Sequence, residues 1–199
     1  MAGCAVEIHQ QTGVPIAALG LSLWVIDRGR PKFSDVLSAV LGLRRPPRGV
    51  AYLYRLERFR PSDPPATSEE WVLGRGVIGE CVASNDQTFR DYRPIQREFP
   101  PTTRLSSAQW KALEKSDRTD GFSKSDFVRM IHRYEQVFAY PITDDDGRVL
   151  GCVSLDVTAP APDSSASPQP SINSKPVVTA VHRLAGSMRA TAQALAVRP

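Results

Sequence analysis

The stretch "VFAYPITDDDGRVLGCVSLDV" (137–157) constrains the fold more than any other, because it reads as two strands joined by a tight acidic turn. Three aspartates precede Gly147, and a glycine supplies the backbone dihedral angles that such a turn needs. Strands joined by a short turn must pair antiparallel. The chain is therefore expected to contain an antiparallel sheet built around this hairpin.

The second strand of the hairpin carries two different faces. Successive side chains of a strand point to opposite sides, and the odd positions from Val149 to Val157 are apolar apart from one glycine. The even positions carry Cys152, Ser154 and Asp156. Burying a hydroxyl and a carboxylate without partners is costly. Either this face lines a small-molecule pocket, or Asp156 caps the strand end or pairs with an arginine from another element.

The remaining segments alternate between strand and helix patterns. We expect a short helix within 1–13, strands over 16–27 and 50–59, a helix over 33–43, a glycine turn with a short helix over 77–83, an extended piece over 88–91, and helices that begin after Ser106 and Ser123. Since no strand is followed by a regular βαβ crossover, the pattern predicts an α+β fold. Its sheet should be mainly antiparallel, with helices on one side.

Composition narrows the class of protein. With 199 residues, 41% of them hydrophobic, the chain can bury one sizeable core. The formal charge of +4 comes largely from scattered arginines, which argues against nucleic acid as a partner. Three cysteines without CxxC spacing favour a reducing, cytoplasmic setting. The longest apolar run, 16–26, is too short to span a bilayer, so the sequence predicts a soluble protein without membrane insertion.

Two segments follow the hairpin. Residues 159–175 are rich in Pro and Ser and are expected to form a mobile linker. Residues 176–199 are expected to form an amphipathic helix with an apolar stripe from Val177 to Leu195. The stripe can fold back on the sheet or pair with a second copy of the chain. We favour the second alternative, a homodimer or a protein partner held by this helix.

Two stretches resemble the GAF family of sensor domains. "GRGVIGECVASNDQTFRDY" is similar to the glycine turn, short helix and extended piece of that family, and "AYPITDDDGRVLGCVSLDV" is similar to its final hairpin. The resemblance implies a GAF-like domain over 14–158 with a helical insert over 93–136. GAF domains bind small molecules on the side of the sheet that corresponds to the even positions, so the resemblance favours the pocket.

The resemblance and the strand pattern together predict a non-enzymatic sensory or regulatory domain. It would bind a small polar or anionic ligand and signal through a dimer or partner surface. The sequence does not identify a cofactor. The residues expected to line the pocket are Trp71, Cys81, Asp91, Tyr92, Phe138, Tyr140, Cys152, Ser154 and Asp156.

Several residues also suggest other functions. Gly74, Gly76 and Gly79 can form a phosphate cradle, but a tight turn is favoured because the helix that follows is short. Enzymes of the GAF family that reduce free methionine sulfoxide use cysteines, two of which this chain lacks. The three histidines are dispersed, so no metal site or catalytic pair is predicted. Two alternatives to the sensor remain: a ligand-free GAF-like protein-interaction module, and a thiol-dependent enzyme like these methionine sulfoxide reductases.

Overall fold

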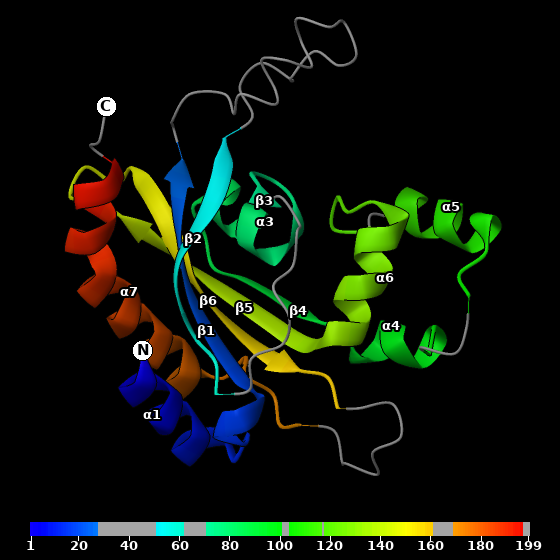
Figure 1. Cartoon of the computed structure of the whole chain (residues 1–199), viewed down its shortest axis with the longest axis horizontal. Helices are drawn as coiled ribbons and strands as arrows, with labels where there is room; N and C mark the ends of the chain where they lie inside the picture. The colour runs from blue at the N-terminus through cyan, green and yellow to red at the C-terminus, as the bar shows by residue number, and fades with distance from the viewer. Residues whose placement is uncertain (28–50, 62–70, 101–103, 117, 161–168, 197–199) are drawn as a thin grey trace, which may run out of the picture.

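The computed structural model describes residues 1–27, 51–61, 71–100, 104–116, 118–160 and 169–196, so the helix expected over 33–43 lies outside the described residues. The fold is α+β, as predicted. A six-stranded sheet has the order β3-β2-β1-β6-β5-β4, and all its neighbouring strands pair antiparallel (Figure 1). The strands are β1 (Leu19–Asp27), β2 (Tyr52–Phe59), β3 (Trp71–Val72), β4 (Thr88–Asp91), β5 (Tyr134–Thr143) and β6 (Val149–Thr158).

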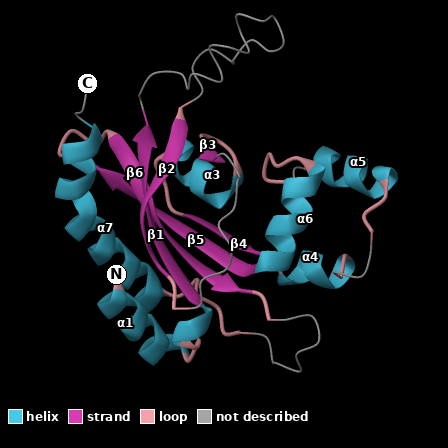
Figure 2. Ribbon diagram, viewed as in Figure 1, coloured by secondary structure: helices cyan, strands magenta, loops and turns pink. Residues whose placement is uncertain are grey.

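Helices cover both faces of the sheet (Figure 2). They are α1 (Ala2–Thr12), α3 (Gly76–Ser84), α4 (Arg93–Glu98), α5 (Ser107–Lys115), α6 (Lys124–Arg133) and α7 (Lys175–Ala196). Helices α1 and α7 lie on one face, and α3 packs on the other. The expectation of helices on one side is therefore wrong. Both faces of β6 are buried, so each face needs a cover.

The starts of two helices follow from local hydrogen bonding. The Ser106 hydroxyl accepts a bond from the Gln109 N–H, and the Gln109 side chain accepts one from the Ser106 N–H, which makes a capping box at the start of α5. The Ser123 hydroxyl accepts a bond from the Asp126 N–H at the start of α6. Both helices therefore begin where the sequence predicts. Helix α4, with Pro94 in its first turn, was not predicted.

The face of the sheet under α1 and α7 is the main apolar core. Val153, Leu155 and Val157 of β6 are fully buried there, together with Val177 and Val181 of α7. The apolar stripe of the terminal helix therefore packs on its own sheet, which is the first of the two alternatives. That stripe is not available to a second copy of the chain.

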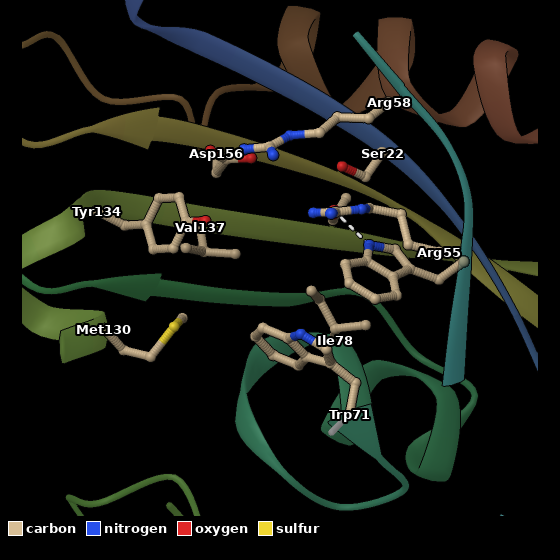
Figure 3. Close-up of a pocket in the computed structure, with 11 residues that line it drawn as sticks. Ser22, Arg55, Arg58, Trp71, Ile78, Met130, Tyr134, Val137 and Asp156 are labelled. Atoms are coloured by element: carbon tan, nitrogen blue, oxygen red, sulfur yellow. Dashed lines mark hydrogen bonds between the residues drawn. The ribbon is translucent and has the colours of Figure 1, made fainter. Parts of the chain in front are cut away.

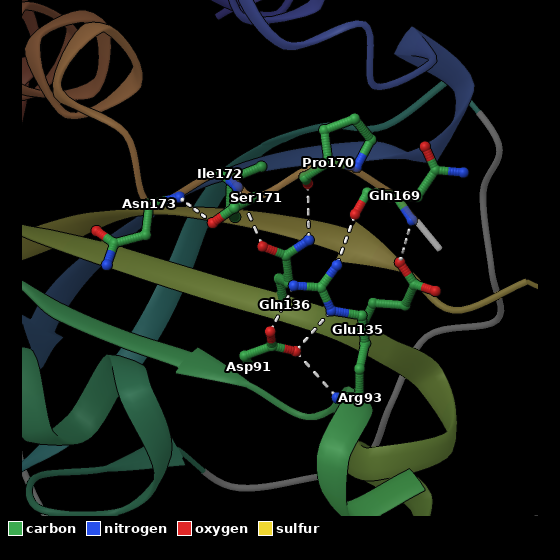
Figure 4. A network of polar contacts seen from close by, with 9 residues as sticks. All are labelled: Asp91, Arg93, Glu135, Gln136, Gln169, Pro170, Ser171, Ile172 and Asn173. Carbon is green, nitrogen blue, oxygen red and sulfur yellow. Dashed lines mark hydrogen bonds and ion pairs between the residues drawn. The ribbon is translucent and has the colours of Figure 1, made fainter. Parts of the chain in front are cut away.

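The chain crosses the sheet again just before α7. Gln136 is fully buried, and its side-chain amide donates to the Pro170 carbonyl at 2.9 Å and accepts from the Ile172 N–H at 3.0 Å (Figure 4). Arg93 donates to the Gln169 carbonyl at 2.6 Å. We call residues 169–173 the strap. Part of the segment expected to be a mobile linker is thus tied down, while 161–168 lie outside the described residues.

Candidate functional site

A pocket opens on the face of the sheet opposite α7, between the strands and the segment that carries α3 (Figure 3). Strands β1, β2 and β6 form its floor and one wall, and Trp71 and Ile78 form the other wall. The residues that line it are Ser22, Trp24, Arg55, Arg58, Trp71, Ile78, Met130, Tyr134, Val137, Ser154 and Asp156. Of the even positions of β6, Ser154 and Asp156 face this pocket, and they lie on one side of the strand as its alternation predicts.

A β-bulge aims two arginines at this pocket. Ser22 pairs with Arg58 and Trp24 pairs with Arg55, and the register of β2 shifts between these two pairs. Without the shift, residues 55 and 58 would point to opposite faces, since strand side chains alternate. A bulge adds one residue and brings both to the same face. Leu56, inside the shifted stretch, packs against the apolar core on the other face.

Two tryptophans form the aromatic part of the wall. The rings of Trp24 and Trp71 lie with their centroids 5.3 Å apart at an angle of 55°. The Trp24 indole N–H donates to the Ser154 hydroxyl at 2.9 Å, which fixes the ring against β6. The Arg55 guanidinium lies 5.6 Å above the Trp24 ring in a cation–π contact. Ser154 accepts the indole bond and retains its own O–H as a donor.

The carboxylate in the floor has an arginine partner. Asp156 forms an ion pair with Arg60, whose side chain is only 1% exposed. Arg60 also donates to the Thr158 hydroxyl at 2.5 Å, and its guanidinium lies 5.5 Å over the Tyr134 ring. Burial lowers the pKa of Arg60 to about 10, so the group stays charged at neutral pH. Asp156 is thus paired within the chain, as the second explanation of this strand proposes.

The close approach of that ion pair depends on a glycine. A Cβ atom built on Gly20 of β1 would overlap the Arg60 guanidinium and the Asp156 carboxylate. Gly20 pairs with Asp156 across the two strands, so its missing side chain leaves the space through which Arg60 reaches the acid. The position accepts no larger residue unless the pair moves.

Two of the predicted pocket residues, Cys81 and Cys152, lie behind the wall. Both are fully buried, on α3 and β6, in the apolar cluster between the helix and the sheet. Burial raises the pKa of the Cys152 thiol well above its usual value, and a hydrogen bond with the Cys81 thiol adds to the rise. All three cysteines of the chain are free thiols. Cys152 is thus a buried neutral thiol, far from the exposed thiolate that nucleophilic attack requires.

Phe138 and Tyr140 lie on the wrong face to line the pocket. They pair across β5 and β6 with Leu155 and Val153, and directly paired residues share a face of the sheet. Phe138 is therefore buried under α7, and Tyr140 stacks on His182 of α7 with ring centroids 4.9 Å apart. The strand pairing, which the sequence does not show, decides this placement.

Asp91 and Tyr92 have structural partners away from the pocket. Asp91 bonds to Arg93 beside the strap, and these bonds outweigh burial and lower the pKa of the Asp91 carboxyl (Figure 4). The Tyr92 hydroxyl donates to Asp120 at 2.9 Å. Burial and the Asp120 carboxylate raise the pKa of Tyr92 well above its usual value. Of the predicted residues, only Trp71, Ser154 and Asp156 therefore line the pocket.

The glycine turn before α3 is fully occupied by protein groups. The Gly74 N–H donates to the Gly79 carbonyl at 2.9 Å, and the Gly76 N–H donates to the Asp120 carbonyl at 2.7 Å. A Cβ atom on Gly79 would overlap the Val72 carbonyl, so this residue permits the close packing of α3 on β3. These amides already have acceptors, so the geometry is that of the favoured tight turn.

Sequence reasoning missed Ser22, Trp24, Arg55 and Arg58. The first two follow the same alternation along β1 as Ser154 and Asp156 do along β6, and this signal was available in "LGLSLWVID". The pair of arginines gave no comparable signal, because residues 55 and 58 share a face only after the bulge in β2. The cationic part of the site therefore depends on strand pairing.

The pocket combines charged and aromatic side chains around a narrow interior. Its lining holds two arginines and one carboxylate, and that carboxylate is engaged by Arg60. About 390 Å³ of space lies between the lining atoms when the open mouth is counted. The volume that the centre of a water molecule can occupy is only about 20 Å³. That is roughly the room for one water molecule. Within the described residues, no group of three or more His, Cys, Asp or Glu side chains is placed to hold a metal ion.

Comparison with known proteins adds no relative. A scan against models of known protein families finds no match, and a search of curated proteins finds no significant match. Among the described segments, none of the helices combines the length and apolar character needed to cross a lipid bilayer.

Proposed function

We propose that the chain is a GAF-like, non-enzymatic sensory or regulatory domain that binds a small planar anion in the pocket between β1, β2, β6 and α3. The observation that carries this proposal is the convergence of Arg55 and Arg58 with the paired rings of Trp24 and Trp71. Guanidinium groups bind carboxylates through paired hydrogen bonds. Tryptophan rings stack on planar groups. Together they match an aromatic or conjugated carboxylate.

The small internal space gives Arg55 a role in binding. Its guanidinium rests over the Trp24 ring, in the place that the ring of a planar ligand would take. A ligand that stacks on Trp24 must move Arg55 aside. The displaced guanidinium then pairs with the carboxylate of the ligand, while the Ser154 O–H donates a further bond. Asp156 keeps Arg60 in position and does not contact the ligand.

The sheet connects this pocket to α7. Ser154 and Asp156 face the pocket, whereas the alternate residues Val153 and Leu155 pack in the core under α7. A ligand that shifts β6 therefore changes the surface on which α7 rests, and α7 or the surface around it would pass the signal to a dimer or to a partner protein. We place the domain in the cytoplasm on account of its free cysteines.

The proposal is tested by titrating the purified chain with benzoate, using the fluorescence of Trp24 and Trp71 and isothermal titration calorimetry. We expect saturable binding of benzoate and none of benzamide, which lacks the charge. Arg58→Gln should weaken binding about tenfold or more, because a hydrogen-bonded charge pair contributes about 1.5–3 kcal/mol. Arg97→Gln, a change on the exposed face of α4, is the matched control and should bind like the unmodified chain.

A second candidate is the ligand-free interaction module. The observation that favours it is the narrow interior of the pocket, which holds about one water molecule. Native mass spectrometry of the freshly purified chain separates the two candidates. A bound small molecule of constant mass supports the sensor. A bare chain that also fails to bind benzoate or any other aromatic carboxylate would leave the interaction module as the function.

A further inference from the structure

A second cavity is lined by the end of β5, by α7 and by Asn85. In this region the C-terminal half of α7 passes the turn between β5 and β6 (Figure 1). The volume that the centre of a water molecule can occupy is about 230 Å³ in this cavity, compared with about 20 Å³ in the pocket beside Trp24. Its walls come from β5, from α7 and from Asn85, the residue that ends α3. It is large enough for a small metabolite.

The cavity exists because two elements leave space. Strand β4 pairs with β5 only from Gln136 to Ala139, so 140–143 have β6 as their strand neighbour on one side only among the described strands. Across the gap, α7 carries Gly186, and a Cβ atom built there meets no atom within 4 Å. Glycine in a helix costs about 1 kcal/mol relative to alanine. Neither a positive φ nor crowding requires glycine at this position.

Each of the polar side chains around the cavity can donate a hydrogen bond. The amide of Asn85, the hydroxyl of Thr143, the ring of His182 and the guanidinium of Arg189 line it, and none of the residues that line it is acidic. His182 is held by its stacking on Tyr140, at an interplanar angle of 27°. This set of donors fits an oxyanion.

The present partners of two donors are weak. Arg189 pairs at 2.7 Å with Asp145, whose side chain is 85% exposed, and an exposed pair contributes little free energy. The Asn85 amide donates to the Gly147 carbonyl at 3.4 Å, at the long limit of a hydrogen bond. Both groups can turn to a ligand at small cost.

We propose that this cavity binds a small molecule bearing an oxyanion, a carboxylate or a phosphate, between Arg189 and His182 of α7 and Asn85 at the end of α3. The ligand bridges the helix on one face of the sheet to the end of the helix on the other. This site is independent of the pocket beside Trp24, since the two cavities share no lining residue.

The test is an NMR titration of the full chain, labelled with ¹⁵N, at constant ionic strength. Inorganic phosphate is added in one arm and malonate in the other, and sodium chloride balances the salt. We expect saturable shifts of the Asn85, Thr143 and Gly186 amide signals with at least one of the two anions and none with chloride alone. The arm that responds identifies the kind of oxyanion.

Variants on the same helix sharpen the result. Arg189→Gln should weaken binding about tenfold or more, because it removes a charged hydrogen bond. Arg183→Gln is the matched control, since Arg183 pairs with Glu7 outside the cavity. It should leave the affinity unchanged.

A second pair of variants separates binding from folding. Gly186→Ala should raise Tm by roughly 2–4 °C through helix propensity and reduce binding by filling the cavity. Gly3→Ala in α1, where a Cβ atom also meets nothing within 4 Å, should stabilise the fold without changing the affinity.

The proposal is overturned if neither anion shifts the Asn85, Thr143 and Gly186 signals, if Arg189→Gln binds as before, or if the shifts map only to Ser22 and Trp24. The last outcome would leave the pocket beside Trp24 standing.

Discussion

The two faces of the central sheet are built from the same strands but differ in chemistry: one is apolar, and the other carries polar groups with specific partners. Under α1 and α7, Val153 and Leu155 of β6 belong to a continuous apolar core. On the other face, their neighbours Ser154 and Asp156 contact Trp24 and Arg60. A face that only had to be buried would carry apolar residues throughout. On the polar face, Ser154 holds the Trp24 ring and Asp156 holds the Arg60 guanidinium.

The largest expected effect tests whether the polar face is also held together by its charges. Asp156→Ala should destabilise the fold by about 3–5 kcal/mol, because it leaves the buried Arg60 charge without its partner. Urea unfolding followed by circular dichroism measures this change. Glu98→Ala removes a carboxylate from a pair that is 47% and 44% exposed, so it should cost at most about 1 kcal/mol.

A double substitution tests whether the unpaired Arg60 charge causes this loss of stability. If the cost arises from the unpaired charge, Arg60→Met combined with Asp156→Leu should recover most of the lost stability, since an apolar pair of similar volume replaces the ion pair. An equal loss in the single and double variants would mean that packing, and not charge, dominates this part of the face.

Adjacent residues of β6 provide the next comparison. Leu155→Ala should cost about 2–5 kcal/mol, because Leu155 is fully buried in the apolar core. Ser154→Ala, one residue away on the other face, should cost about 1 kcal/mol through the lost bond to the Trp24 indole. Chemical denaturation of both variants measures the difference. Similar losses of stability for the two variants would contradict the difference between the apolar and the polar face.

The smallest effect concerns the polar margin of the apolar face, where the strap crosses the sheet. Hydrogen bonds from Arg93 lower the pKa of Asp91, so its contribution to stability is complete above the ordinary value of 3.8 and is lost as pH falls through the lowered pKa. Asp91→Asn should therefore lower the free energy of unfolding at pH 7 by less than about 1 kcal/mol, the contribution of a partly exposed ion pair, and Tm should fall accordingly. Thermal unfolding at neutral and strongly acidic pH should show this difference shrinking. A constant difference would remove Asp91 from the pH dependence.

The features that sequence reasoning predicted correctly are those set by neighbouring residues. Ser106 and Ser123 begin helices because a cap is a local hydrogen bond. The alternation of β6 placed Ser154 and Asp156 on one face because strand geometry has a period of two. These signals need no knowledge of the rest of the fold.

The features that were missed depend on pairing between distant segments. The sequence predicts that Phe138 lines the pocket, but its pairing with Leu155 puts it under α7. Arg58 reaches the pocket only through a bulge against β1. The apolar stripe of α7 is visible in the sequence, but whether it meets a sheet or a second chain is decided by where the strap leads it.

Residues 20, 60 and 156 constrain one another, because Gly20 leaves the space in which Arg60 and Asp156 pair. An arginine at 60 and an acid at 156 can coexist in this fold only while the strand between them offers a bare α-carbon. Substituting any one of the three alone leaves either a steric overlap or a stranded charge. Libraries that randomise this domain should therefore vary residues 20, 60 and 156 together, and surviving combinations should keep Gly20 wherever they keep the ion pair, and carry a larger residue at 20 only where 60 and 156 are both uncharged.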